Sequence, residues 1–484
     1  MTDARESSSL MERPKRKMSG MGAALLAGTW PPEMEMIEPT VNLLALFDTA
    51  PSLAVAITAT ERHLWPCYRF SSCMGDGGYW VPWEGPMDNA YHFVELQMAS
   101  EADIDQWVQT AMFQTLRRDR PPWRITVLHA KQGRSAIWFQ VHHSVGDGLG
   151  LVFAFIPMLR CEEHGVRVDP FSKIPLPAAL LPKSARKPGG GGGVTPGGQP
   201  AREASSSGEA GGGCLARIKY FFKGMLISLL CKHDAELCIN APLGERTPFL
   251  RFNARRVYTR FPPVPMETVR AVRNKVTCTV NDVVMAALTG ALRRYGAEVG
   301  NDPSLRDDGP EDIEFKSLFM IGLPRPLNED NLADSLANNI LFASCGLPIG
   351  DKTASGRLEK TIQTFSNLKS KSYMAGLAGF TAFVKGVAPT NLMRKAASET
   401  FSKHTLLVTN VPSTTCPMIM PDAPGGQMVK EMQMVFPNLI TQVSLISYNG
   451  AVYSNIIADP ALIAQPHVLG KFFLEEFHTL ANPV

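Results

Sequence analysis

The sequence predicts a mixed fold of helices and strands, α/β or α+β, in which two halves each contain a mixed sheet. Hydrophobic residues make up 45% and charged residues 19% of the 484-residue chain, an ordinary composition for a folded globular protein. Apolar residues recur with both strand and helix periods, without the strict strand–helix alternation typical of a parallel sheet. A segment rich in glycine, proline and serine separates two regions of normal domain size.

This separating segment sets the domain organisation that we expect. Residues 183–213 contain eleven of the forty glycines, and such a composition cannot build a core. We therefore expect a flexible, disordered linker at this place. The resulting division is a basic flexible tail at 1–18, an N-terminal half at 19–182, the linker at 183–214 and a C-terminal half at 215–484.

Charge and cysteine usage exclude several classes of protein. Lysine and arginine total 48 against 45 acidic residues, and a net charge of +3 is too small for a nucleic-acid binder with a broad basic field. The nine cysteines are odd in number, scattered and without a Cys-x-x-Cys pair, so we expect neither a disulfide framework nor a zinc module, and a reducing compartment is the default.

Residues 215–231 form the segment that most suggests a membrane, although no stretch reaches the ~18 uninterrupted apolar residues of a spanning helix. Its apolar residues recur at helical spacing, while Arg217, Lys219 and Lys223 supply positive charge. This pattern is typical of a helix lying in a bilayer interface, and equally of a core-facing helix with solvated lysines. The sequence leaves both interpretations open.

Three local patterns define elements in the N-terminal half. Ser100 with Asp103 predicts a capping box that opens a helix with one apolar stripe. Two alternating runs at 124–130 and 135–143, separated by a short polar turn, predict a β-hairpin. The run at 149–160 is apolar nearly all round, which predicts a buried helix despite its proline.

In the C-terminal half, a helix is predicted to begin at Asn281. It carries apolar residues and ends in basic ones. We expect either Asn281 or Asp282 to act as its cap, with Asn281 facing the substrate as the alternative. Strands are predicted at 317–322, 339–347, 405–411, 442–447 and 451–457.

The strongest chemical signal is the stretch from Val141 to Gly148 at the end of the second hairpin strand. Side chains alternate along a strand, so His142 and His143 face different environments and cannot do the same work. Two glycines in the following turn allow Asp147 to lie near this corner. A neutral imidazole at the end of a strand is suited to removing a proton from a hydroxyl near neutral pH.

Other interpretations of these residues are weaker. Two histidines and a carboxylate can bind a metal, but adjacent strand residues diverge and no further ligand clusters nearby, so we expect no metal. Gly146, Gly148 and Gly150 imitate part of a dinucleotide loop, but the last glycine comes one place early. Buried histidines also often complete a hydrogen-bond network without any catalytic role.

The stretch HHSVGDG at 142–148 resembles the His-His-x-x-x-Asp-Gly signature of the CoA-dependent acyltransferase superfamily, which includes chloramphenicol acetyltransferase. Further stretches resemble one branch, the wax ester synthase/diacylglycerol acyltransferase family, O-acyltransferases of the plant and algal wax synthase type. They are SGMGAALLA at 19–27, RPPW at 120–123, TVNDVV at 279–284, GALRRY at 290–295, LANN at 336–339, TNVP at 409–412 and SYNG at 447–450. The absence of an Asp-Phe-Gly-Trp-Gly motif argues against the plant BAHD branch.

These stretches follow the family's order over nearly the whole chain, apart from the tail and the linker. The chain departs from the family pattern at Ala337, which stands for a glycine, and at Ser413 and Thr414, which replace a final Gly-Pro. These positions are expected where the backbone bends close to the substrate, so the departures bear on substrate preference more than on reaction class.

The resemblance implies two chloramphenicol-acetyltransferase-like halves, each a mixed sheet flanked by helices, with a tunnel between them. It implies His143 as general base, with His142, Asp147 and Gly148 supporting the catalytic loop. Asp147 is expected to be anchored to a basic side chain that the sequence does not identify, and Gly148 is expected to permit a tight turn and close substrate approach. Two further residues, Asn281 and Asn410, are candidates for substrate contact.

The implied reaction transfers an acyl group from acyl-CoA to a long-chain alcohol or diacylglycerol, giving wax esters or triacylglycerol. Acyl-CoA is then a substrate, and no cofactor is expected. The implied location is the cytosolic face of the endoplasmic reticulum or a lipid droplet, with the cytoplasm otherwise. Two alternatives remain: a condensation-type acyltransferase that uses carrier-bound acyl groups, and an inactive lipid-binding homologue.

Overall fold

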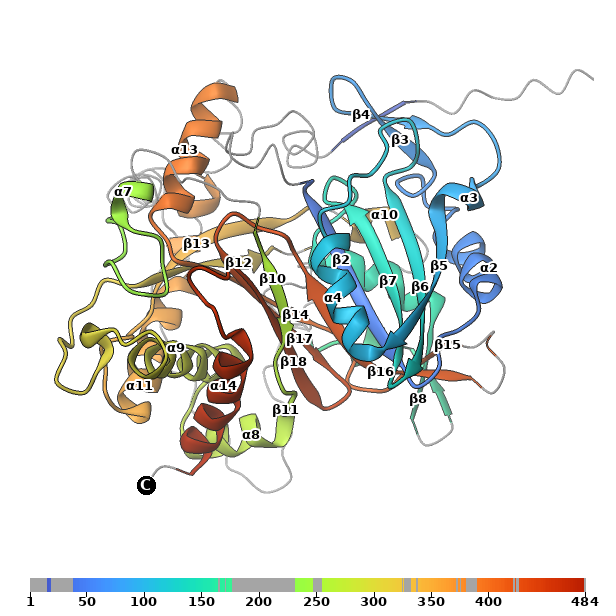
Figure 1. The fold of residues 1–484 in the computed structure, drawn as a ribbon. Helices are drawn as coiled ribbons and strands as arrows, with labels where there is room; N and C mark the ends of the chain where they lie inside the picture. Colours follow the sequence, from blue (N-terminus) through green and yellow to red (C-terminus); the bar gives the residue numbers. More distant parts are fainter. Residues whose placement is uncertain are drawn as a thin grey trace, which may run out of the picture.

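The computed structural model describes residues 15–18, 38–163, 166–169, 171–175, 231–246, 255–323, 325, 332–336, 338–370, 373–374, 376–379, 390–420, 423 and 426–482. Two halves, each built around a sheet, lie side by side (Figure 1). This mixed architecture confirms the predicted fold class. The predicted linker, the 19–27 stretch and nearly all of 215–231 lie outside the described residues, so those predictions stay untested.

The sheet of the N-terminal half has eight strands within the described residues. Their order is β5 (Phe93–Ser100), β6 (Trp123–Gln132), β7 (Ser135–His142), β2 (Thr40–Phe47), β16 (Gln427–Val435), β15 (Met418–Met420), β8 (Arg160–Glu163) and β9 (Val166–Val168). β6 and β7 form the predicted hairpin, and β2 pairs antiparallel with β7 along its whole length.

Side-chain alternation along β7 separates its two faces as the sequence predicted. Phe139 and Val141 belong to a core that also contains α2 (Leu53–His63) and α5 (Gly148–Phe155). Trp138 points to the opposite face, where it packs with residues of α4 (Glu101–Ala111). The strand is therefore buried on both sides, which fixes the position of the histidines at its end.

The sheet of the C-terminal half runs in the order β10 (Val257–Arg260), β18 (Ala451–Ala458), β17 (Thr441–Tyr448), β14 (Leu406–Pro412), β12 (Lys316–Gly322) and β13 (Ile340–Gly346), with β11 (Val264–Pro265) also on β18. The five strands predicted in this half all occur within about two residues of their expected positions. Three helices pack together against one face: α9 (Val280–Glu298), α11 (Ala354–Leu368) and α14 (Pro466–Ala481) (Figure 1).

Smaller elements complete the described fold. A three-stranded sheet contains β1 (Arg16–Lys17), β4 (Tyr79–Pro82) and β3 (Ser72–Gly75). The remaining helices are α3 (Asn89–His92), α7 (Leu243–Arg246), α8 (Met266–Lys275), α10 (Leu332–Ser335) and α13 (Thr390–Ser402), with 3-10 turns η2 (Ile156–Met158), η3 (Phe171–Lys173) and η6 (Pro303–Leu305).

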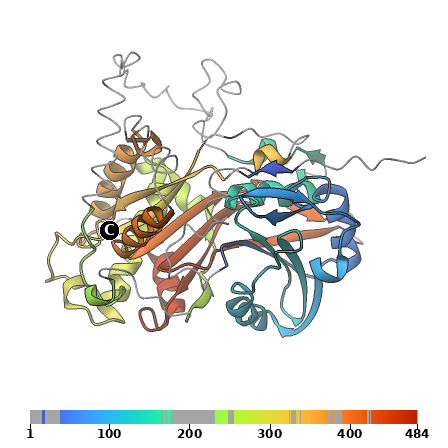
Figure 2. The ribbon, with the colours of Figure 1, turned by 90° about the horizontal axis from the view of Figure 1, so that it is seen from above.

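Strands β15 and β16 belong to the C-terminal part of the sequence but complete the N-terminal sheet, a crossover that is visible from above (Figure 2). β16 pairs antiparallel with β2 from Val429 opposite Phe47 to Val435 opposite Asn42. The sequence did not predict this exchange, because strand pairing between distant segments leaves no local pattern. As a result, the C-terminal part of the chain is anchored in the N-terminal sheet through the β2–β16 ladder.

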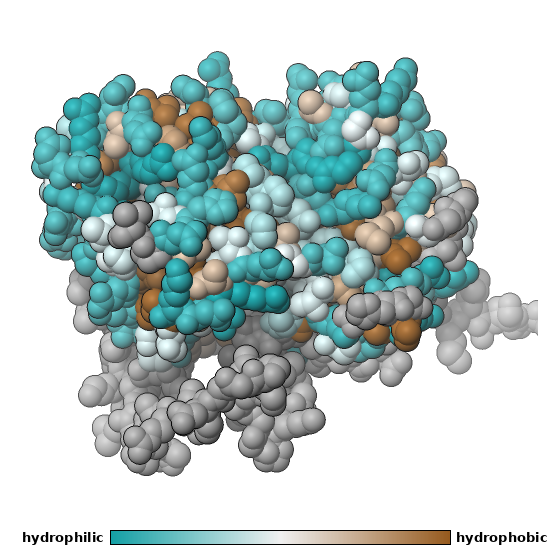
Figure 3. Space-filling view, turned by 90° about the horizontal axis from the view of Figure 1, so that it is seen from below, coloured by the Kyte–Doolittle hydropathy of each residue, from teal (hydrophilic) through white to brown (hydrophobic). Residues whose placement is uncertain are grey.

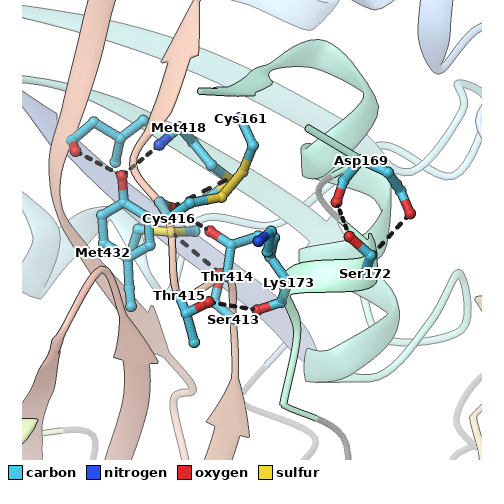
Figure 4. Close-up of a disulfide and its surroundings, with 12 residues drawn as sticks. Cys161, Asp169, Ser172, Lys173, Ser413, Thr414, Thr415, Cys416, Met418 and Met432 are labelled. Carbon is cyan, nitrogen blue, oxygen red and sulfur yellow. Dashed lines mark hydrogen bonds between the residues drawn. A yellow bond between two sulfur atoms is a disulfide. The ribbon is translucent and has the colours of Figure 1, made fainter. Parts of the chain in front are cut away.

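A disulfide joins Cys161 of β8 to Cys416, which precedes β15 (Figure 4). Both cysteines are buried, and 255 residues separate them in the sequence. The sequence predicted no disulfide framework and gave no sign of this single bond, because one pair so distant in sequence produces none of the spacing patterns on which that prediction rested. The bond ties the segment after α5 to the segment after β14.

Helix starts agree with the sequence in one half and correct it in the other. Ser100 caps α4 and forms the predicted capping box with Asp103. The predicted helix at 149–160 divides into α5 and η2, and β8 begins at Arg160. At α9, Thr279 is the N-cap and Asp282 closes a capping box, so Asn281 is not the cap.

A buried ion pair locks the three helices of the C-terminal half together. Arg357 of α11 donates to Glu476 of α14 at 2.6 Å, and both side chains are about 5% exposed. Gly290 of α9 passes so close that a Cβ atom there would lie 2.1 Å from the Glu476 carboxylate. Only glycine fits at this position, which gives a packing reason for the glycine of the GALRRY stretch.

Among the described residues, the exposed large hydrophobic side chains are Tyr79, Val166, Leu243 and Val276. No helix among the described residues is long and apolar enough to cross a membrane. On the face seen in Figure 3, hydrophobic residues form small separate patches among hydrophilic ones.

Candidate active site

The loop after β7 carries the two histidines and the aspartate that the sequence analysis identified. β7 ends at His142, and the N–H groups of His142 and His143 donate to proline carbonyls of two other segments. Helix α5 then begins at Gly148, with Asp147 as its N-cap accepting from the Gly150 N–H at 2.9 Å. The loop is therefore fixed at both ends by backbone hydrogen bonds.

A cavity of about 60 Å³ lies between this loop and the strands of the C-terminal half. The loop contributes His143, Asp147 and Gly148. The C-terminal half contributes residues of β12, β13 and β14, among them Met320, Ile340 and Asn410. The cavity thus combines residues from both halves.

His143 lines this cavity and keeps one ring nitrogen engaged. Its Nδ1 lies 3.0 Å from the side-chain oxygen of Asn338. Burial lowers the pKa of His143 below its usual value, although its own backbone, the Asp147 carboxylate and the Asn338 hydrogen bond act in the opposite direction. The imidazole is therefore neutral at neutral pH, as a general base must be.

His142 occupies a different environment, as the strand alternation predicted. Its side chain is fully buried, and its Nδ1 lies 2.8 Å from the Ser144 hydroxyl and accepts from the Ser144 N–H at 3.1 Å. Its Nε2 lies 3.6 Å from a carboxylate oxygen of Glu38. Burial holds the pKa of His142 well below its usual value, with smaller contributions from Arg118 and His143. His142 thus stays neutral and supports the loop.

The basic partner of Asp147 is Arg325. Two hydrogen bonds of 2.7 and 2.6 Å join the guanidinium to the carboxylate, and the side chains are only 1% and 3% exposed. The Asn339 N–H adds a further bond to the same carboxylate at 3.2 Å. Asp147 therefore anchors the loop to Arg325 and Asn339, which belong to the C-terminal part of the sequence.

The backbone of Gly148 does not adopt the left-handed conformation that favours glycine in some tight turns. A Cβ atom at this position would lie 3.0 Å from Phe436 and 3.3 Å from Val411. The physical reason for glycine is therefore close packing against the C-terminal half. The backbone conformation thus does not bear out the expected turn requirement, whereas the expected close substrate approach stays a prediction, since Gly148 lines the cavity.

Asn281 and Asn410, which are distant in sequence, meet at the cavity. The Asn410 amide donates to the Asn281 side-chain oxygen at 2.6 Å. Asn410 lines the cavity, whereas Asn281 lies behind it on the first turn of α9. The structure thus brings together the two candidates for substrate contact.

Two residues of this site were not identified as functional from the sequence. Arg325 and Asn338 lie 178 and 195 residues from the groups they contact, so no local spacing could reveal them. Asn338 belonged to the LANN stretch of the family resemblance, which was the one available signal. Among the described residues, no group of three or more histidine, cysteine or acidic side chains could hold a metal ion.

Two family models match this chain on either side of the 285–335 region. Residues 80–284 match the wax ester synthase/diacylglycerol acyltransferase catalytic domain, and residues 336–481 match the WS/DGAT C-terminal domain. The chain belongs to the wax ester synthase/diacylglycerol acyltransferase family. This finding confirms the resemblance seen in the sequence.

Individual relatives are distant. A putative diacylglycerol O-acyltransferase of Mycobacterium tuberculosis is 25% identical over 248 residues, which cover 49% of this chain and 50% of the relative. The chain thus spans about half the length of that relative. The probable diacylglycerol O-acyltransferase tgs1 of the same species is 22% identical over 452 residues, 89% of each protein.

Solved structures support the fold. The wax ester synthase/diacylglycerol acyltransferase of Marinobacter aquaeolei VT8 superposes with a TM-score of 0.59 at 17% identity, covering 96% of this chain and 98% of that one. The first condensation domain of the calcium-dependent antibiotic synthetase gives the same TM-score at 11% identity, covering 98% and 97%. At these identities the likeness shows the fold that wax ester synthases and condensation domains share.

Proposed function

We propose that this member of the family transfers a fatty-acyl group from acyl-CoA to the hydroxyl of a long-chain alcohol or of diacylglycerol, giving a wax ester or triacylglycerol. The observation that carries the proposal is the position of His143 in the cavity between the halves, with Nδ1 bonded to Asn338 and Nε2 left to receive a proton.

In the proposed reaction, Nε2 of His143 removes the hydroxyl proton while the alcohol oxygen attacks the thioester carbonyl. The tetrahedral intermediate then expels the thiolate of CoA, which takes the proton back from Nε2, so atoms and charge balance. No acyl-enzyme, metal or organic cofactor is required, because acyl-CoA itself supplies the activated acyl group.

The amide pair beside the base supports a role in substrate contact. Asn410 gives one amide hydrogen to Asn281, which leaves its second hydrogen and its oxygen for a molecule in the cavity. We therefore assign Asn410 to the substrate and Asn281 to orienting Asn410. A donor in this position is suited to the oxyanion that forms during attack.

The size of the cavity bears on how substrates enter. A volume of about 60 Å³ is far below the roughly 300–1,000 Å³ of typical ligand sites. Binding a long acyl chain therefore requires lining side chains to move, and the flexible Met320 is suited to this. Since the proposed substrates and products are apolar, we propose that the enzyme works at a membrane or lipid-droplet surface.

The test is an assay of the purified protein with radiolabelled palmitoyl-CoA and either hexadecanol or dioleoylglycerol. We expect ester formation by the wild type and a loss of about 10²- to 10⁴-fold in His143→Ala. His129→Ala serves as the control, because His129 is a partly exposed histidine of β6 that bonds Glu95.

Two outcomes contradict the proposal. If the His143→Ala variant keeps the wild-type activity, His143 is not the general base. If the folded wild type esterifies neither acceptor, the enzyme uses carrier-bound acyl donors or only binds lipid. Assays with acyl-carrier substrates and with lipids then distinguish these two alternatives.

A further inference from the structure

The side chain of Asn338 bridges the catalytic loop and the C-terminal half. Its nitrogen donates to the His143 carbonyl at 2.7 Å and lies 3.5 Å from the Ser144 carbonyl, while its oxygen lies 3.0 Å from His143 Nδ1. The residue is 7% exposed. All of its polar contacts described here are thus to the backbone and side chain of the loop that carries the base.

These contacts determine which way the amide points. Backbone carbonyls only accept hydrogen bonds, so the NH₂ group must face the carbonyls of His143 and Ser144. The amide oxygen then faces His143 Nδ1, and an oxygen can only accept. The Nδ1 atom of His143 must therefore carry the proton, which leaves Nε2 with a free lone pair.

The neighbouring histidine is held in the opposite tautomer. Nδ1 of His142 accepts from the Ser144 N–H, so in the neutral ring the proton of His142 resides on Nε2. The same loop thus contains two neutral histidines with opposite proton positions. Only His143 is held in the form that presents a basic Nε2.

We propose that Asn338 is the positioning residue that fixes the tautomer of His143 and thereby makes the base competent. Because His143 and Asn338 come from the N-terminal and C-terminal parts of the sequence, the base is assembled only where the segment around Asn338 packs against the catalytic loop. This inference deepens the proposed function, since it rests on His143 being the base.

Several other contacts hold the Asn338 segment against the loop. Arg69, from the N-terminal half, donates to the Val145 carbonyl at 2.8 Å and reaches the Leu336 carbonyl at 3.4 Å. A Cβ atom on Gly146 would lie 2.9 Å from the same Leu336 carbonyl. The backbone on both sides of the contact is thus fixed, so the amide has little freedom to leave His143.

The experiment compares Asn338→Leu and Asn338→Asp with the wild type. Leucine removes the Asn338 acceptor and leaves Nδ1–H only the backbone of His143 itself, so the other tautomer of His143 becomes more accessible and we expect kcat to fall about 10- to 100-fold. Holding the wrong tautomer outright in a serine protease triad costs about 10⁴-fold, which sets the upper bound. Aspartate keeps an acceptor for Nδ1–H but places its second oxygen against the carbonyls of His143 and Ser144, so we expect its activity to lie between that of leucine and that of the wild type.

The pH profile separates positioning from a merely structural role. The charged and titratable groups around His143 are His142, Asp147 and Arg325, and the last two are bonded to each other. A carboxylate at position 338 stabilises the imidazolium, so the acidic limb of kcat/KM should move to higher pH in Asn338→Asp. A structural defect alone would lower the rate without moving this limb.

A spectroscopic readout tests the tautomer without any assay. In the NMR spectrum of ¹⁵N-histidine-labelled protein, the signals of His143 are assigned as those that disappear in His143→Gln. They should report a protonated Nδ1 and an unprotonated Nε2. In Asn338→Leu they should report exchange between the two tautomers. The matched control is Asn240→Leu, because Asn240 is likewise buried and bonds Ala235 and Thr405 away from the cavity. It should leave both the tautomer and the pH limb unchanged.

The inference is overturned if His143 of the wild type carries its proton on Nε2, or if Asn338→Leu keeps the wild-type kcat. Failure of the proposed function looks different. In that case His143→Ala retains activity or no ester forms, whatever tautomer the spectrum reports.

Discussion

The Asp147–Arg325 ion pair should govern both the stability of the protein and the docking of its two halves. The perturbation is Arg325→Met, which removes the charge while keeping a long apolar side chain. Since the two side chains are only 3% and 1% exposed, the change leaves a carboxylate buried without its counter-charge. Breaking a buried pair in this way typically costs about 3–5 kcal/mol.

The contacts that remain to Asp147 place the expected cost at the lower end of that range. Its carboxylate still accepts from the Gly150 and Asn339 N–H groups and still lies at the N-terminus of α5. We therefore expect a loss of about 3 kcal/mol in the free energy of unfolding, or roughly 150-fold in the folded-to-unfolded ratio. Asparagine at 147 can still cap α5, so the double variant Arg325→Met/Asp147→Asn should recover about 2 kcal/mol of the loss.

Urea unfolding followed by tryptophan fluorescence measures these free energies, and the acyl-transfer assay measures the accompanying loss of activity. The reasoning is refuted if Arg325→Met costs less than about 1 kcal/mol, or if the double variant costs as much as the sum of the two single variants.

Three further changes test other parts of the structure. Gly290→Ala places a Cβ atom 2.1 Å from the Glu476 carboxylate, so it should lower the free energy of unfolding by about 3 kcal/mol or more. The control Gly244→Ala, whose Cβ atom would meet nothing within 4 Å, should change this free energy by less than about 1 kcal/mol. Equal effects of the two variants in urea unfolding would contradict the packing argument. Cys161→Ser should destabilise the oxidised protein by about 2–4 kcal/mol. The difference in stability between variant and wild type should vanish when both are measured with a reductant. A difference that persists in the reductant would mean that packing, not the covalent bond, is responsible. Burial alone would raise the pKa of Glu101, but hydrogen bonds from arginine side chains lower it to about 2. The wild type should therefore lose stability as the pH falls from about 4.5 through about 2, and the Glu101→Gln variant should lose less stability over the same window. Parallel acid-unfolding curves of the two proteins would contradict this assignment.

Elements with a local signature were predictable from the sequence. The β6–β7 hairpin, the capping box of α4 and five strands of the C-terminal half lie within about two residues of their predicted bounds. Each depends on alternation, capping or turn chemistry within ten to twenty neighbouring residues. The exchange of β15 and β16 between the halves depends on distant pairing and was not predicted.

The candidate site shows the same division. His142, His143 and Asp147 were found because seven adjacent residues carry the pattern. The cap of α9 was misassigned because Asn281 or Asp282 was expected there instead of Thr279, although the spacing of Thr279 and Asp282 fits the capping box that the structure shows. The cysteine pair and the partners of the loop had no comparable local signal.

The connections between the halves limit how substrates can reach the base. The β2–β16 ladder and the Cys161–Cys416 disulfide tie the C-terminal part of the chain into the N-terminal sheet, and Asp147 and His143 are bonded to Arg325 and Asn338 of that same part. Opening the halves to admit a substrate would therefore break the His143–Asn338 and Asp147–Arg325 contacts on which the proposed mechanism depends. If these contacts persist during catalysis, the cavity enlarges by movement of the side chains that line it, and the choice between alcohol and diacylglycerol should then depend on the size and flexibility of those side chains.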